Sequence, residues 1–408
     1  MNRLLVIVCL CVLPLQASLQ QEETVAALFR AITLRDINGV LKVLAEGVDV
    51  NIPAVDGRLP LLKAAAVGDK RIVKTLLERG AYIDIQDDRG AVALSSAALY
   101  GQVEVIKMLL ANGANVDISD KTGVTPLWLA AQQGQTDVID ILLDGGANFN
   151  AADQDGITPL MVAASANRQD AVLLLLSRGS DVHAKTHDGV GALMGAAFGG
   201  HGAVVQSLLA QGADVLVSDP AGRTALMAAA ASGSQEAVDA LLRHRIDIEI
   251  EDTNGTTALV YAATRGHMQV TQSLINAGAS KGRVEALMMA SEKGEIALLM
   301  TLLDRGVDVN AKAYGGMTPL IMAALSGQAE TVKLLLANGA HINAADSQGQ
   351  TALMVTAETG DLSLVKLLVN HGADVAASDK SGLQAWHHAM RKDHQVLADF
   401  FEVLGGKP

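Results

Sequence analysis

A glycine that returns every 33 residues is the feature that most limits what this chain can fold into. It follows an apolar run each time, at Gly47, Gly80, Gly113, Gly146, Gly179 and Gly212. Self-similarity at such a period indicates stacked supersecondary units, each of which buries its apolar face only against its neighbours. The composition agrees, because apolar residues make up 50% of the chain and aromatic residues only 3%. Thin layers of small helices need less aromatic bulk than one large core.

The stretch from Thr125 to Asn150 shows the content of one unit most clearly. Thr125 is a suitable N-cap, and Pro126 suits the first helical position. Apolar residues at helical spacing continue to Gly134, and a second apolar run ends at Gly146. A polar segment then leads to the next Thr-Pro-Leu. Each unit is therefore predicted to contain a helix, a tight turn, a second helix and a projecting turn.

Together, Thr-Pro-Leu, the paired alanines, the glycine turn and the Leu-Leu run resemble the ankyrin repeat. Residues 339–343 (Gly-Ala-His-Ile-Asn) and 372–375 (Gly-Ala-Asp-Val) match the end of that motif. The resemblance implies an all-α ankyrin-repeat solenoid of about 11 to 12 stacked helix-turn-helix units over residues 23–404. It also implies a non-catalytic scaffold that binds protein through a concave face of projecting turns and first helices. The Thr-Ala-Leu-Met sequence at 224–227 and 351–354 is similar to that of bacterial ankyrin proteins.

One position departs from the resemblance in most units. The family often has a histidine after Thr-Pro-Leu, and here only His387 keeps it. Because most of the substitutes are apolar, we expect packing between repeats to replace a buried polar network. The substitutes are Leu62, Ser95, Trp128, Met161, Met194, Met227, Val260, Met288, Ile321 and Met354.

Two irregularities break the period. Arg245 stands where other units have glycine, and a side chain at positive φ costs about 1 kcal/mol. Arg245→Gly is therefore expected to stabilise the protein. Around Ser280–Arg283 five residues are missing, which predicts a shortened or absent projecting turn. We expect two blocks, 23–280 and 281–404, joined by an irregular step that is a hinge, a change of curvature or a neutral deletion.

Residues 1–18 are predicted to be a secretory signal peptide. Arg3 precedes the apolar run Leu4–Leu15, which is too short to span a bilayer. Both cysteines lie in this segment, so the mature chain would have no disulfide and no thiol chemistry. The net charge of −13 repels nucleic acid and anionic lipid. We expect a periplasmic or secreted monomer, not inserted in a membrane after signal cleavage, whose partner is a neutral or basic protein.

The motifs of the sequence predict no catalytic site, no metal site and no cofactor. Residues 278–282 match the G-x-S-x-G pattern of hydrolases, but they follow a helix end instead of a strand. His387 and His394 would lie about 10 Å apart along a helix, too far to share one ion. The chain is therefore not expected to be an enzyme.

Binding residues are expected where the units differ from one another, because aromatic and arginine side chains anchor many interfaces. At each such position the alternative is a solvated or locally packed residue. At the turn tips the candidates are Arg89, Lys121, His187, Arg223, Thr253 and Tyr314, and on the first helices they are Leu99, Tyr100, Gln132, Gln133, Phe198 and Arg265. Besides a scaffold, the same surface is compatible with an inhibitor or immunity protein of a periplasmic enzyme, or with a host-directed effector.

Overall fold

The computed structural model describes residues 21–405, so the predicted signal peptide lies outside the described residues. The helices fall into two compact units, with the boundary in the chain after Pro220, and no strand forms in residues 21–405. The first unit contains a helix over residues 21–33, then α2 (Ile37–Ala45), α3 (Pro60–Val67), α4 (Lys70–Glu78), α5 (Ala93–Leu99), α6 (Val103–Ala111), α7 (Pro126–Gln133), α8 (Thr136–Asp144), α9 (Pro159–Ser165), α10 (Gln169–Ser177), α11 (Ala192–Phe198) and α12 (Gly202–Ala210).

The second unit is again built from helices alone, apart from one short 3-10 turn. It contains α13 (Ala225–Ser232), α14 (Gln235–Leu242), α15 (Ala258–Thr264), α16 (Met268–Asn276), α17 (Arg283–Lys293), α18 (Ile296–Asp304), η1 (Tyr314–Gly316), α19 (Pro319–Leu325), α20 (Ala329–Ala337), α21 (Ala352–Thr359), α22 (Leu362–Asn370), α23 (Ala385–Arg391) and α24 (Gln395–Val403).

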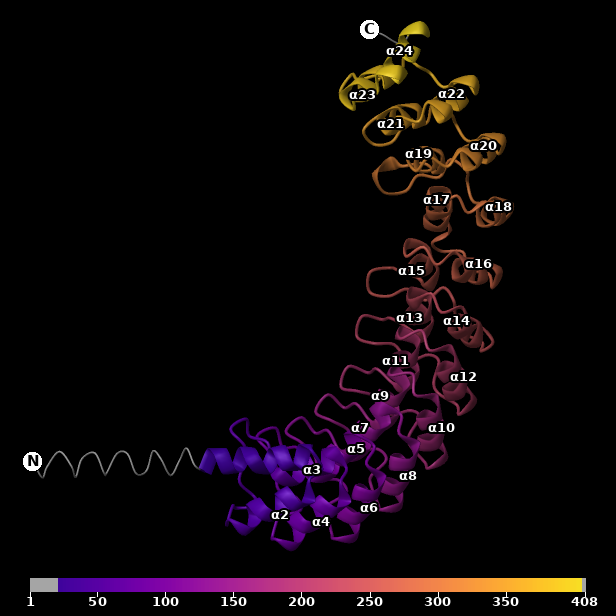
Figure 1. Ribbon diagram of the computed structural model, residues 1–408. Helices are drawn as coiled ribbons and strands as arrows, with labels where there is room; N and C mark the ends of the chain where they lie inside the picture. The colour runs from indigo at the N-terminus through magenta and orange to yellow at the C-terminus, as the bar shows by residue number, and fades with distance from the viewer. Residues whose placement is uncertain (1–20, 406–408) are drawn as a thin grey trace, which may run out of the picture. The chain divides into compact units, whose positions relative to one another are not determined.

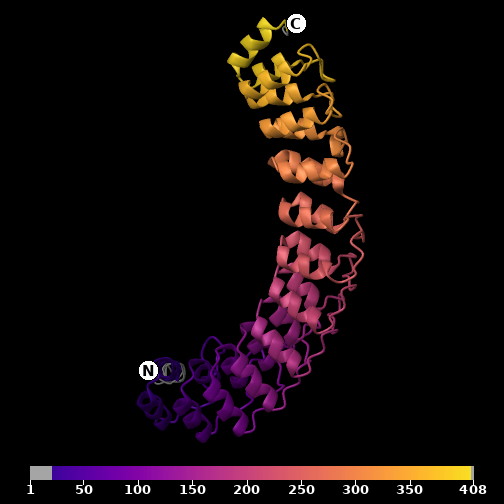
Figure 2. The same ribbon diagram turned by 90° about the vertical axis from the view of Figure 1, so that its right-hand side faces the viewer.

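Within each unit the helices pair in chain order, and each pair packs on the next (Figure 1). Figure 2, turned by 90°, shows that the helix pairs are stacked in chain order within each unit. The all-α repeat solenoid expected from the sequence is therefore confirmed.

The unit from Thr125 onward forms as its sequence predicts. The Thr125 hydroxyl accepts a hydrogen bond from the Trp128 N–H at 3.2 Å and caps α7. Gly134 ends this helix at φ 75°, in the left-handed region that favours glycine. The apolar residues of α7 and α8 that face the neighbouring pairs are fully buried, so local signals and packing agree. They include Leu127, Ala130, Ala131, Ile139 and Leu142.

The positions that replace the family's histidine lie in the interior, as expected. Leu62, Met161, Met194, Met227, Met288, Ile321 and Met354 are buried, whereas Trp128 and Val260 are half-buried. Ser95 is buried too, and its hydroxyl donates to the Val92 carbonyl at 2.9 Å. The Trp128 indole donates to the Ile157 carbonyl at 3.2 Å.

The expectation that Arg245 adopts a positive φ is wrong. The positive φ angles outside glycine belong to Arg35, Asn167 and Asp393. The chain avoids the strained conformation because the turn opens: the Ile246 N–H bonds the His244 carbonyl and not a carbonyl of the preceding helix. In the repeats that have glycine here, the turn closes back on the helix.

The irregular step lies inside the second unit. Gly282 turns the chain directly into α17 at φ 92°, and a β-carbon there would come within 2.4 Å of the Val260 side chain. Only glycine fits this position without a shift. The projecting turn before α17 is therefore absent, as the missing residues predict, while the boundary between the compact units lies at Pro220. A hinge at the step stays a prediction.

Candidate functional site

The projecting turns, called fingers from here on, are five-residue loops closed by a backbone hydrogen bond from their first to their fifth residue. Most begin with an aspartate that shapes the loop. In finger 120–124, one Asp120 oxygen accepts from the N–H groups of Thr122 and Val124 at 2.8 and 3.0 Å. These aspartates were not predicted, although an aspartate three residues before a glycine recurs in the sequence. They are Asp87, Asp120, Asp153, Asp219, Asp252, Asp346 and Asp379.

Most neighbouring fingers are joined by one further backbone hydrogen bond, although fingers 54–58 and 87–91 share none among the described residues. In the first unit, the Lys121 N–H donates to the Arg89 carbonyl at 3.0 Å. The Gln154 N–H likewise donates to the Thr122 carbonyl at 2.9 Å, and the His187 N–H donates to the Asp155 carbonyl at 3.2 Å. These hydrogen bonds join successive finger tips in a row, which is called the finger ladder from here on. The predicted residues Arg89, Lys121 and His187 lie in this row.

In the first unit the predicted residues are accessible. Arg89, Lys121 and His187 are exposed at the finger tips. On the first helices, Tyr100 is 60% and Phe198 40% exposed, which is high for aromatic side chains. Leu99 and Gln132 are half-buried, whereas Gln133 is exposed. These five positions lie at the C-terminal ends of α5, α7 and α11, in two adjacent registers of the repeat.

Part of this predicted set shares one pocket. A cavity of about 470 Å³ opens between fingers 54–58 and 87–91 and the helices α3 and α5. Arg89, Leu99 and Tyr100 line it, together with Lys63 and the paired Asp56 and Arg58. Neither Lys63 nor Arg89 forms an ion pair within residues 21–405. The pocket therefore offers an aromatic ring and two cations to a partner, beside the carboxylates of Asp87 and Asp88.

In the second unit, Arg265 belongs to a small polar cluster. Its guanidinium lies 5.5 Å from the centre of the Tyr261 ring and donates to the Ala231 carbonyl at 2.9 Å. The Tyr261 hydroxyl donates to Asp252 at 2.7 Å. Burial, and then this hydrogen bond, raise the pKa of Tyr261, so its hydroxyl stays protonated as a donor. The cluster fixes Arg265 against the helix while its side chain stays exposed.

The other predicted residues of the second unit differ in accessibility. Tyr314 is 100% exposed in finger 313–317, and Thr253 is exposed in finger 252–256. Arg223 is half-buried and has interactions of its own. Tyr314 is therefore the most accessible aromatic residue that the sequence predicted.

His388, in the last unit, is buried between two carboxylates. Its ring is 1% exposed, with Nδ1 2.6 Å from Glu358 and Nε2 3.1 Å from Asp379. Burial acts to raise the pKa of Asp379, but the N–H groups of Leu383 and Ser381 and the His388 ring together hold it below its usual value. His388 therefore has a structural role, linking α23 to α21 and to the last finger.

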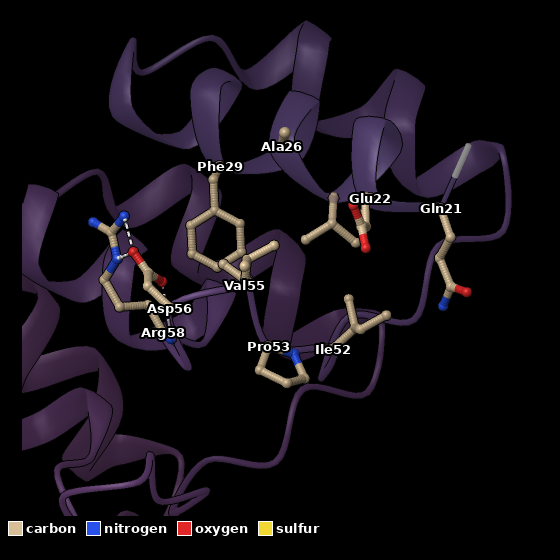
Figure 3. Close-up of a pocket in the computed structure, with 11 residues that line it drawn as sticks. Gln21, Glu22, Ala26, Phe29, Ile52, Pro53, Val55, Asp56 and Arg58 are labelled. Carbon is tan, nitrogen blue, oxygen red and sulfur yellow. Dashed lines mark hydrogen bonds and ion pairs between the residues drawn. The ribbon is translucent and has the colours of Figure 1, made fainter. Parts of the chain in front are cut away.

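A second pocket, of about 600 Å³, lies in the first repeat (Figure 3). Phe29, Ile52 and Val55 form its apolar wall, and the Arg58–Asp56 ion pair lies at its edge. The Arg58 side chain, by hydrogen bonding, lowers the pKa of Asp56. The sequence did not predict this pocket, because its walls come from a repeat that lacks the Thr-Pro-Leu entry.

Features that would indicate chemistry or a membrane are not found in the described part of the chain. Residues 21–405 hold no group of three or more histidine, cysteine or acidic side chains placed to bind a metal. The hydroxyl of Ser280, in the G-x-S-x-G pattern, donates to Glu249 at 2.8 Å and so links its segment to the preceding repeat. Across the same residues, no helix combines the length and apolar character needed to cross a bilayer.

Comparison with models of known protein families identifies a family for this chain. The family model described as ankyrin repeats (3 copies) matches residues 28–120, 94–186, 193–285, 280–346 and 343–401. No curated protein matches the chain. The matched segments cover most of the described residues, and the helix pairs with their fingers have the expected form. The chain therefore belongs to the ankyrin-repeat family, whose members are in general protein–protein interaction modules and typically non-catalytic scaffolds.

Proposed function

We propose that this protein is a non-catalytic scaffold that binds a partner protein through the fingers and first helices of its units. The observation that carries the proposal is the pocket lined by Arg89, Leu99 and Tyr100. There, exposed aromatic and cationic side chains project from a frame fixed by the packing of α3 on α5 and by the hydrogen bond between fingers 87–91 and 120–124. Rigid, accessible aromatic and arginine side chains are the usual anchors of protein interfaces.

The charge of the chain supports a neutral or basic partner, because a net charge of −13 repels strongly acidic proteins. We further propose a monomer that acts in the periplasm or outside the cell, after cleavage of residues 1–18. The short apolar run at the start supports this location. N-terminal sequencing of the protein from the periplasmic and culture fractions tests it, and an uncleaved N-terminus in the cytosol contradicts it.

Affinity capture with the full chain, followed by mass spectrometry, tests the binding function. The informative comparison is between two sets of variants. Tyr100→Ala with Arg89→Ala removes the proposed anchors, whereas Leu173→Ala with Lys107→Ala changes exposed residues on the second helices. A partner that the control pair retains and the anchor pair loses supports the proposal. A partner lost equally with both pairs, or retained with both, contradicts it.

A further inference from the structure

The row of fingers is interrupted in the second unit at α17 (Figure 1). Finger 252–256 precedes α15 and finger 313–317 precedes α19, but Gly282 leads straight into α17. The place that one finger occupies elsewhere is therefore open. This gap is a property of the present chain and not of the repeat pattern, because it follows from the five missing residues.

The finger ladder of the second unit stops at the gap and resumes after it. The Thr253 N–H donates to the Ala221 carbonyl at 2.9 Å, and the Ser347 N–H donates to the Gly315 carbonyl at 2.8 Å. By the same pattern, the Asn254 carbonyl would accept from the missing finger, and the Tyr314 N–H would donate to it. Neither group has a hydrogen-bond partner among the described residues. The gap thus presents one backbone acceptor and one backbone donor to an incoming chain.

The floor of the gap is a pocket of about 530 Å³ between the start of α17 and the segment 305–313. Three cationic side chains line it: Arg283, Arg305 and Lys312. Each donates to a backbone carbonyl, and none forms an ion pair within the part of the chain described. Two carboxylates, those of Glu285 and Asp308, also line the pocket, so its cations exceed its anions by one.

A backbone N–H in this pocket also lacks an acceptor. In three other repeats of the second unit, those of Ser280, His341 and Asp374, a side-chain oxygen of the preceding repeat accepts from this N–H, whereas the N–H of Asp247 has no such acceptor among the described residues. Glu249 accepts from Ser280 at 2.6 Å, and Asn310 accepts from His341 at 2.8 Å. The corresponding N–H of Asp308 has no partner in residues 21–405, because the segment that would supply one is missing. A carboxylate or amide oxygen of a bound partner can accept a hydrogen bond from this N–H.

We propose that the gap between fingers 252–256 and 313–317 accepts a β-turn of the partner protein that carries an aspartate, in the place of the missing finger. The inference rests on the proposed function and names the chemistry of one contact. The turn continues the ladder through Asn254 and Tyr314, and its carboxylate faces Arg305 and Lys312. An aspartate suits the position because the chain's own fingers are built on one. The fully exposed Tyr314 ring covers the inserted turn.

A cyclised peptide that presents Asp-Thr-Asn-Gly-Thr, the sequence of finger 252–256, tests the proposal directly. Its binding to the full chain is measured by fluorescence anisotropy. We expect saturable binding that weakens by about tenfold or more in Arg305→Glu with Lys312→Glu, since charge-assisted hydrogen bonds are lost. Lys333→Glu, an exposed change on α20, is the matched control and leaves the affinity within about twofold. A peptide with lysine in place of aspartate is not expected to bind.

A restored finger gives an independent readout. Replacing residues 280–285 by a copy of residues 247–257 restores the period, so this variant is expected to keep its melting temperature and to lose peptide binding. Binding that survives in the restored variant, or that the charge reversals leave unchanged, overturns the proposal. Self-association of the chain that the restored finger abolishes also overturns it, since a second copy would then occupy the gap. If capture of a partner succeeds and the peptide does not bind, this inference fails and the proposed function stands.

Discussion

Asp252 shows how much one finger depends on a single carboxylate. One oxygen accepts from the N–H groups of Asn254 and Thr256 at 2.8 and 2.9 Å, and the other accepts from Tyr261. The Thr256 N–H, more than the Tyr261 hydroxyl, lowers the pKa of Asp252. A carboxyl group whose folded pKa lies below its unfolded value, near 3.9, stabilises the fold above that value. This contribution is lost as the pH falls through the folded pKa.

Asp252→Ala is therefore expected to lower the free energy of unfolding at pH 7 by about 1 to 3 kcal/mol. The difference from the parent protein should shrink as the pH falls below about 4, where the parent carboxyl also becomes protonated. Urea unfolding followed by circular dichroism between pH 7 and 2 measures both. Asp188→Ala is the control, because Asp188 is exposed in a finger and makes no hydrogen bond through its side chain among the described residues. Equal effects of the two substitutions contradict this account.

The opened turn at Arg245 also leads to a prediction. In neighbouring repeats the residue after the turn glycine is a buried alanine, such as Ala213 or Ala279, whereas here it is the larger Ile246. Restoring both residues should let the turn close and regain its hydrogen bond to the helix. Arg245→Gly with Ile246→Ala is expected to raise the free energy of unfolding by about 1 kcal/mol, and Arg245→Gly alone by less. Thermal melting of the parent protein, the single variant and the double variant measures these differences. A lower melting temperature of the double variant than of the parent contradicts the closed turn.

At the scale of helices, the caps decide where each first helix begins. Thr125 caps α7 through the Trp128 N–H, whereas Thr136 begins α8 with a hydroxyl that has no partner among the described residues. Thr125→Ala is expected to cost about 1 kcal/mol of stability, and Thr136→Ala close to nothing. Chemical unfolding of the two variants measures the difference. Similar losses would mean that the hydrogen bond is not the cause.

These local signals explain why the helices could be predicted from the sequence. Threonine caps, turn glycines and apolar spacing act within one repeat, so a single repeat such as Thr125–Asn150 contains what it needs. The candidate site was predicted only in part. Exposed positions such as Tyr100 and Tyr314 could be read from variation between repeats. The burial of His388 could not, because Glu358, 30 residues earlier, supplies one of its two contacts.

The same limit applies to the gap before α17. The missing residues at 280–283 predicted an absent finger, but not the pocket that it leaves. Arg305 and Lys312 belong to the following repeat, and only stacking brings them beside Arg283. Contacts between repeats therefore determine what the site can bind, whereas the signals within a repeat determine where its helices begin and end.

At the scale of the whole molecule, each helix pair contacts only its neighbours along the chain, and the contacts divide into two units at Pro220. In such chains stability is close to a sum of repeat and interface terms. A local loss of packing is therefore expected to spread through one unit without reaching distant repeats. The core residues Leu142 in α8 and Leu335 in α20 are both fully buried and provide a matched pair for this test.

Leu142→Ala removes about 2 to 5 kcal/mol of packing energy from the first unit. We expect faster hydrogen exchange in α7 to α10 and unchanged exchange in α19 to α24, because the two segments belong to different compact units. Leu335→Ala should give the reverse pattern. Hydrogen exchange followed by mass spectrometry of peptides from both units measures this. A uniform increase along the whole chain with either substitution would show instead that the repeats unfold as one cooperative body, and the partner would then bind a scaffold in which stability at any one finger depends on all the others.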